Sequence, residues 1–246
     1  LLSALALLRL PENVLKLAGV VEQHEILADA VVGADGYESQ IGRWAGIDTS
    51  LKPNDILTCY QYRLTNIKYD SDYCEFVLGS AAPGGYVWVF PKTDDTANVG
   101  LGVLTTLIKN PGDPKMYLDK FIAETPGLKD GQPLECVAGA VSVCAPLDSV
   151  CIDHVILVGD AARQIDPITG GGISNSCIAG MFAGKALAKA KETGDYTMNT
   201  FQEYEANWRD RLENKLWRNW MAKEKLVTLD DATLDSLVKT ISEVGV

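Results

Sequence analysis

The amino-acid sequence predicts a mixed α/β fold, in which part of a doubly wound domain is interleaved with an antiparallel sheet and followed by helices. Three observations carry this prediction. Two short apolar runs end in Asp-Gly or Gly-Asp turns and lead into helical patterns, as strands of open α/β sheets do. Between them, residues 56–104 repeat with a period of two, which is typical of strands. From residue 199 onward the spacing is helical.

Composition and charge narrow the class of protein. The chain has 246 residues, of which 47% are hydrophobic and 22% charged, enough for a sizeable core. The net charge of −11 argues against a nucleic-acid surface, which needs a basic stripe. No apolar run reaches the length of about eighteen residues that a transmembrane helix needs. Six scattered cysteines and two histidines show no metal-ligand spacing, so we expect reduced, buried thiols and no metal.

The amino-terminal part is predicted to hold one weak helix and at least one strand before the first turn motif. Residues 1–27 are typical of a weak helix followed by a strand or hairpin. Residues 30–33 form an apolar run that predicts a buried strand ending at Asp35-Gly36, and residues 37–45 have helical spacing. Asp35 has two interpretations of equal weight, as the cap of that helix or as a ligand contact.

The middle of the chain predicts short strands joined by tight turns. Asp, Ser, Gly and Pro residues separate the alternating runs, which favours an antiparallel sheet. The predicted strands cover residues 57–64, 73–78, 86–90, 97–104 and 134–145, and a helix is predicted over 114–124.

Three aromatic residues stand at alternate positions of one predicted strand. The alternation places Tyr86, Trp88 and Phe90 on one face and Val87 and Val89 on the other. The aromatic face would either wall a pocket for a flat ring or an apolar chain, or form an ordinary core face under a helix.

The strongest motif follows the apolar run at residues 155–158. Gly159-Asp160 ends the predicted strand, and three consecutive glycines precede an Ala-rich helix predicted over 173–191. The Asp160 carboxylate can accept hydrogen bonds from ligand hydroxyls, and the N–H groups of Gly171, Gly172 and Ile173 can meet anionic or polarised oxygens. The alternative is an ordinary strand-to-helix connection.

Two further helices are predicted over residues 199–225 and 231–246. The first is rich in Trp and Arg, which is typical of an amphipathic packing helix with a solvated face. Its alternative interpretation is contact with a membrane surface.

Together these motifs resemble the geranylgeranyl reductase family, within the class that shares the para-hydroxybenzoate-hydroxylase-type fold. The resemblance covers about residues 28–191. The residues that carry it are Gly33-Ala-Asp35-Gly36, the Pro83-x-x-Tyr86-x-Trp88-x-Phe90-Pro91 pattern, and Gly159-Asp160-Ala-Ala with Pro167, Gly170 and Gly172. It implies an FAD-binding domain over 1–53 and 146–195, an antiparallel-sheet substrate domain over 54–145 and a C-terminal helical region over 196–246.

The resemblance also implies an activity. A flavoprotein oxidoreductase of this family would use FAD to reduce C=C bonds in the geranylgeranyl chains of an isoprenoid ether phospholipid precursor, a step of archaeal membrane lipid biosynthesis. It implies that Asp160, Gly171, Gly172, Ile173 and the Asp35-Gly36 turn contact the cofactor. Tyr86, Trp88 and Phe90 would contact the lipid.

The resemblance leaves several roles open. The electron donor would be NAD(P)H or reduced ferredoxin, and the proton donor would be Tyr86 or a group outside this chain. The expected location is cytoplasmic, with peripheral contact at the membrane.

One departure from the family is large. Its opening Gly-x-Gly-x-x-Gly strand–turn–helix and an early cysteine motif have no counterpart here. We therefore expect an N-terminally truncated gene product that lacks the first βαβ unit. Two alternatives stay open, an FAD-dependent monooxygenase or halogenase of the same fold and an inactive fragment that binds lipid or a partner.

Overall fold

The chain forms two compact units, each made of two stretches of sequence. The computed structural model describes residues 28–244. The first unit contains residues 28–50 and Ala145–Trp217, and the second contains Leu51–Cys144 and residues 218–244. The predicted helix and strand in residues 1–27 lie outside the described residues.

The first unit holds a three-stranded sheet in the order β1-β8-β7. The strands are β1 (Val31–Gly33), β8 (Val155–Leu157) and β7 (Cys151–Ile152), with β1 parallel and β7 antiparallel to β8. Because β1 and β8 are parallel neighbours, the two turn motifs that follow them start at the same edge of the sheet.

The prediction that the first strand is buried was wrong in part. Val32 is 40% exposed, and only Gly33 of the three β1 residues is buried. The reason is that β1 pairs with a single strand, β8, within the described part of the chain.

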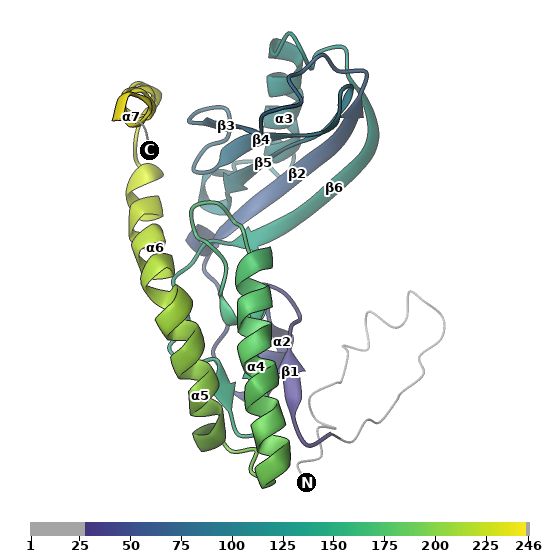
Figure 1. Ribbon diagram of the computed structural model, residues 1–246. Helices are drawn as coiled ribbons and strands as arrows, with labels where there is room; N and C mark the ends of the chain where they lie inside the picture. Colours follow the sequence, from purple (N-terminus) through teal and green to yellow (C-terminus); the bar gives the residue numbers. More distant parts are fainter. Residues whose placement is uncertain (1–27, 245–246) are drawn as a thin grey trace. The chain divides into compact units, whose positions relative to one another are not determined.

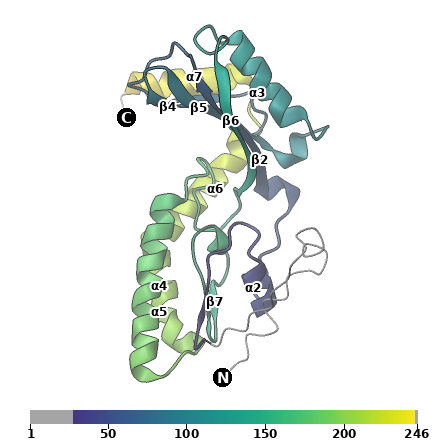
Figure 2. The same cartoon turned by 90° about the vertical axis from the view of Figure 1, so that its right-hand side faces the viewer.

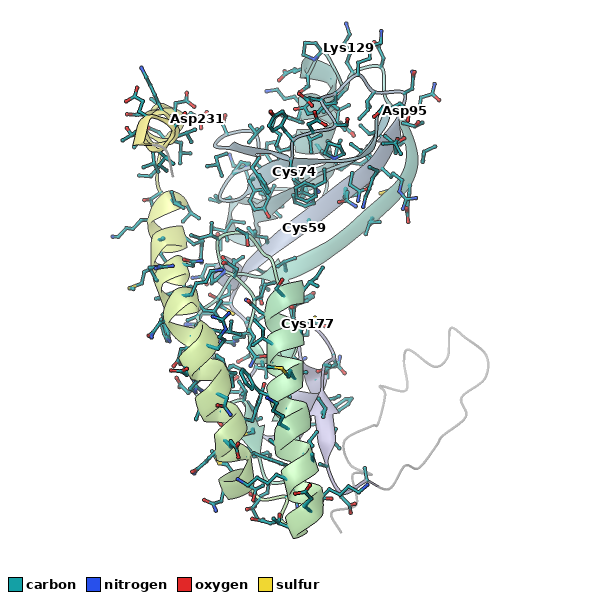
Figure 3. All side chains as sticks on the ribbon, in the orientation of Figure 1. Cys59, Cys74, Asp95, Lys129, Cys177 and Asp231 are labelled. Atoms are coloured by element: carbon teal, nitrogen blue, oxygen red, sulfur yellow. The ribbon has the colours of Figure 1, made fainter. Side chains whose placement is uncertain are left out.

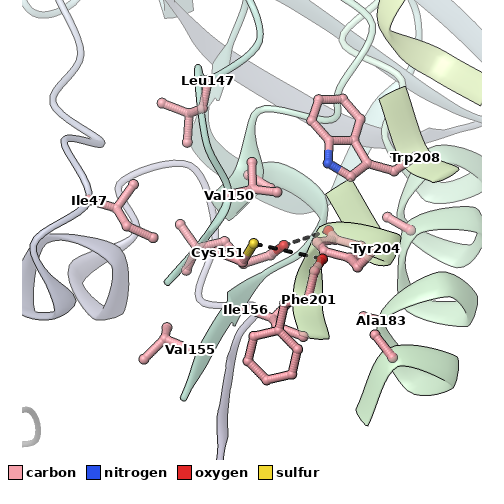
Figure 4. Packing of buried hydrophobic residues seen from close by; sticks show 14 of the residues in the cluster. Ile47, Leu147, Val150, Cys151, Val155, Ile156, Ala183, Phe201, Tyr204 and Trp208 are labelled. Atoms are coloured by element: carbon pink, nitrogen blue, oxygen red, sulfur yellow. Dashed lines mark hydrogen bonds between the residues drawn. The ribbon is translucent and has the colours of Figure 1, made fainter. Parts of the chain in front are cut away.

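Two long helices pack on this sheet. Helix α4 (Ile173–Thr193) and helix α5 (Met198–Trp208) run side by side in both views (Figure 1 and Figure 2). The buried residues of α4 are all alanines, which lets the helix axis approach its neighbours closely. From α5, Phe201, Tyr204 and Trp208 are fully buried and pack against the strand residues shown in Figure 4.

The helix predicted over 199–225 has an interruption that the sequence pattern did not indicate. Helix α5 continues through a five-residue π-helical segment, Arg209–Glu213, into α6 (Asn214–Leu226). Two of its Trp and Arg residues make the contacts expected of a packing helix. Trp208 is fully buried, and the Arg209 guanidinium lies 4.5 Å from the centre of its ring.

The second unit contains the predicted antiparallel sheet, in the order β3-β4-β5-β2-β6. All four neighbouring pairs are antiparallel. The strands are β2 (Ile56–Thr65), β3 (Glu75–Leu78), β4 (Tyr86–Thr93), β5 (Thr96–Leu104) and β6 (Gln132–Ser142).

Helix α3 (Asp113–Glu124) covers one face of this sheet (Figure 1). The Asp113 carboxylate accepts the N–H groups of Lys109 and Asn110 at 2.9 and 3.0 Å, which fixes the start of the helix. Leu118 of α3 is fully buried in the same cluster as Val87 and the other inward valines and leucines of β4 and β5. Short 3-10 turns, Pro53–Asp55 and Thr105–Leu107, flank the sheet.

Helix α7 (Asp231–Val244) is tied to the loop after β3 at its first residue, labelled in Figure 3. The Asp231 carboxylate accepts hydrogen bonds from the Ser80 N–H at 2.8 Å and the Ser80 hydroxyl at 2.6 Å. Among residues 28–244, no helix is long and apolar enough to cross a bilayer.

Candidate functional site

The Gly-Asp loop begins with a glycine that no other residue could replace easily. Gly159 has φ of 65°, in the left-handed region that favours glycine. A Cβ atom at this position would also lie 2.8 Å from the Ser176 Oγ of helix α4. Backbone conformation and close approach therefore both require glycine where β8 turns toward α4.

The carboxylate of Asp160 is the unusual group of the loop. It is half-buried, and no residue between 28 and 244 donates a hydrogen bond to it. Burial raises the pKa of this carboxyl above its ordinary value. A Cβ at Gly172 would lie 2.8 Å from Asp160 Oδ1, so the carboxylate rests against the start of α4 with no side chain between.

The start of α4 is itself open. Its N-cap is Gly172, which has no side chain to cap the free N–H groups of the first turn. Ile173, the first helical residue, is 86% exposed. The positive end of a 21-residue helix and a carboxylate without a donor therefore stand together, as the sequence motif predicted.

Asp35 has the capping role that was one of its two predicted interpretations. Its carboxylate accepts the Ile41 N–H at 2.9 Å and the Ser39 hydroxyl at 3.1 Å. Helix α2 (Gln40–Ala45) begins three residues later than predicted, because Ser39 adopts φ of 37° and is the N-cap. Gly36, at φ of 85°, makes the turn between strand and helix. The register of β1 on β8 brings this turn and the Gly-Asp loop to one sheet edge.

In the second unit, the predicted aromatic face is present and is larger than predicted. Phe76 of β3 joins the row, with its ring centre 5.4 Å from that of Tyr86 and 5.5 Å from that of Phe90. Trp88 and Phe90 stack at 6.1 Å. Val87, on the opposite face, is fully buried in the cluster under α3. The aromatic face is therefore not the face that α3 packs.

Two residues that the sequence interpretation missed hold Trp88 in place. The indole Nε1 donates to Gln61 Oε1 at 2.9 Å. A Cβ at Gly100 would lie 2.5 Å from the indole ring, so the ring passes close over the backbone of β5. Gly102 leaves similar room beside Cys59, whose thiol pKa is raised to about 11 by burial. Glycines at alternate positions of one strand, Gly100 and Gly102, were the signal that could have predicted this close packing.

The cysteines only partly follow the sequence prediction. Figure 3 labels Cys59 in β2, Cys74 just before β3 and Cys177 in α4. Cys74, Cys136 and Cys177 are exposed, which corrects the expectation of buried thiols. No group of three or more His, Cys, Asp or Glu side chains in the described part of the chain could hold a metal ion.

Comparison with known proteins assigns the family. The model of the geranylgeranyl reductase catalytic domain matches residues 55–141, the segment that holds most of the second unit's sheet. Digeranylgeranylglycerophospholipid reductase of Thermoplasma volcanium is 49% identical over 234 residues, which is 93% of this chain. The chain belongs to the geranylgeranyl reductase family. It spans 59% of the length of that reductase.

Solved structures agree with the family and show how far the fold extends. The crystal structure of a geranylgeranyl bacteriochlorophyll reductase-like protein from Thermoplasma acidophilum matches with a TM-score of 0.87 and 49% identity. The match covers 89% of this chain and 55% of the chain in that crystal structure. A flavin-dependent brominase matches with a TM-score of 0.61 and 18% identity. This match covers 76% of the present chain and 49% of the brominase chain, and at such low identity it shows a shared fold alone. The mixed α/β fold and the reductase family are thus both confirmed.

Proposed function

We propose that this chain is part of an FAD-dependent enzyme that reduces C=C bonds in the geranylgeranyl chains of an isoprenoid ether phospholipid precursor. The observation that carries the proposal is the aromatic face of β3 and β4, which lies within the segment matched by the reductase catalytic-domain model. The name of the Thermoplasma volcanium relative gives the substrate class.

The residues of the first unit fit a flavin. Asp160 has a carboxylate without a donor from residues 28–244, which suits a ribityl hydroxyl. The uncapped N–H groups after Gly172 suit the polarised oxygens of the ring or a phosphate. Gly171 and Gly172 leave room for close approach of the cofactor. When bound, reduced FAD would supply the hydride equivalent that an alkene carbon accepts.

Tyr86, Trp88 and Phe90 would hold the lipid chain. An isolated alkene is a poor hydride acceptor, so the reaction needs an apolar surface that excludes water and fixes the chain. Trp88 is suited to that task because Gln61 and the absence of a side chain at Gly100 hold its indole in one place over β5.

A chimaera tests this proposal. In it, the present chain replaces the matching segment of the Thermoplasma volcanium reductase, and the product is purified with FAD. Incubation with a digeranylgeranyl glycerophospholipid under reducing conditions should give saturated chains, detected by mass spectrometry as added hydrogen. A Trp88→Ala chimaera should bind flavin normally and lose most of the product.

Three results would count against the reductase. A chimaera that binds FAD and leaves the lipid unreduced would remove the proposed activity. Product that forms only with oxygen, with an oxygen or halogen atom added, would instead favour the monooxygenase or halogenase alternative. If the chain binds the lipid but no flavin, this result would indicate the inactive-fragment alternative.

A further inference from the structure

We infer that Gln164 and Tyr204 are positioning residues, which fix the Gly-Asp loop so that Asp160 is presented to the cofactor. The inference rests on the proposed function for its ligand. Its geometry concerns the first unit alone, and neither residue was singled out by the motifs.

Gln164 closes the loop from both sides. Its side-chain Oε1 accepts the Gly159 N–H at 2.8 Å, and its backbone N–H donates to the Gly159 carbonyl at 3.0 Å. Both backbone polar groups of Gly159, the residue before Asp160, are therefore satisfied within the loop. Gln164 is fully buried, so water cannot easily substitute for its amide.

Tyr204 links this loop to helix α5. Its hydroxyl donates to the Leu157 carbonyl at 2.6 Å and accepts from the Gln164 Nε2 at 2.9 Å. A hydroxyl has one proton, so these two bonds fix the orientation of the Gln164 amide. Oε1 must then face Gly159. One buried side chain thus ties the end of β8 and the loop that follows it to the same point.

Helix α5 is a rigid support for Tyr204. The neighbouring Glu205 carboxylate accepts the Val150 N–H at 2.7 Å, the Ser149 hydroxyl at 2.9 Å and the Arg209 Nε at 2.9 Å. The first two bonds anchor the helix to the residues just before β7. The tyrosine ring itself is fully buried in the hydrophobic core.

The consequence is preorganisation. The carboxylate of Asp160 is held by no bond of its own from the described residues, so its position depends on the loop backbone. A loop that is fixed on folding does not need to be ordered when the ligand binds. Loss of the buried bonds should therefore weaken flavin binding, although neither Gln164 nor Tyr204 is proposed to touch the flavin.

Hydrogen exchange tests the geometry without any cofactor. In the purified 246-residue chain, Tyr204→Phe and Gln164→Met each remove two of these buried side-chain hydrogen bonds while nearly keeping side-chain size. Amides of residues 159–173 should exchange about tenfold faster, whereas those of β4 and β5 should not change. Tyr196→Phe is the matched control, because the ring stacks on His154 and no described residue bonds its hydroxyl. Unchanged loop exchange in both variants would overturn the inference.

Flavin titration tests the link to Asp160. In the chimaera described above, Tyr204→Phe and Gln164→Met should each raise the Kd for FAD about tenfold, measured by fluorescence quenching, because the loop must then be ordered when the ligand binds. Combining Tyr204→Phe with Asp160→Asn should cost less than the sum of the two, because both act through one carboxylate. Additive losses would contradict the inference. If the unmutated chimaera binds no FAD, the cofactor proposal fails, while the exchange result on the 246-residue chain still decides the positioning.

Discussion

The backbone N–H of Gly159 donates a hydrogen bond to the Oε1 of Gln164 at 2.8 Å, inside a loop of six residues. Both partners are buried. The loop that carries Asp160 is therefore shaped by the core of the first unit and not by surface contacts. This explains why a glycine-rich connection can hold a carboxylate in a fixed place, and it makes the energetic role of each neighbouring residue testable.

Replacing the Asp160 carboxylate should raise the stability of the flavin-free protein and weaken its binding of FAD. Burial raises the pKa of this carboxyl above 3.8, so the folded state holds its proton more tightly than the unfolded state does. Stability is then lost as pH rises through the window above 3.8. Asp160→Asn should raise the melting temperature of the flavin-free protein at pH 7 and have no such effect at pH 3. Its Kd for FAD should increase about tenfold or more. A lower melting temperature at pH 7 would contradict this account.

Gly172→Ala should damage the site through one methyl group. The added Cβ would lie 2.8 Å from Asp160 Oδ1 and must push the carboxylate away. Binding of FAD should weaken about tenfold while far-ultraviolet circular dichroism stays unchanged. The control is Gly180→Ala in the same helix, where a Cβ meets nothing within 4 Å. That change should stabilise the chain by about 0.5–1 kcal/mol, because alanine favours the helix.

Gly100→Ala should displace Trp88 from the aromatic face. The new Cβ would come within 2.5 Å of the indole ring, and the ring cannot move without losing its bond to Gln61. We expect a loss of about 1–3 kcal/mol in the free energy of unfolding and a shift in tryptophan emission. Gly139→Ala on β6 adds a Cβ into open space and should change neither measurement. Equal effects from the two substitutions would show that Gly100 is not a special position.

Glu205→Gln should lower the free energy of unfolding far more than the same substitution at an exposed glutamate. Its carboxylate serves Val150, Ser149, Trp208 and Arg209 and has a side chain only 11% exposed. Urea denaturation should show a loss of about 3 kcal/mol, because a neutral amide leaves Arg209 with a poorer partner in a buried place. Glu203→Gln breaks the pair with Lys189, whose side chains are half exposed, and should cost less than about 1 kcal/mol.

Local sequence patterns were sufficient for most elements. Alternation predicted the strands from 57 to 104, and helical spacing predicted α3, α4 and α7 to within a few residues. The start of α2 was predicted wrongly because Ser39 adopts a left-handed backbone conformation, which a serine in the sequence does not indicate. The π-helical segment at Arg209–Glu213 depends on packing, which a local pattern does not contain.

The sequence by itself determined which residues are chemically special: a carboxylate after a strand, glycines before a helix and aromatics at alternate positions. Those features depend on local backbone geometry and on short spacings, which the sequence states directly. Only the tertiary structure decided that Gly100 and Gln61 hold Trp88 in place and that Tyr204 supports the Asp160 loop from 44 residues away. Such contacts join residues distant in the chain, and they form only when burial leaves each polar group a single partner within reach.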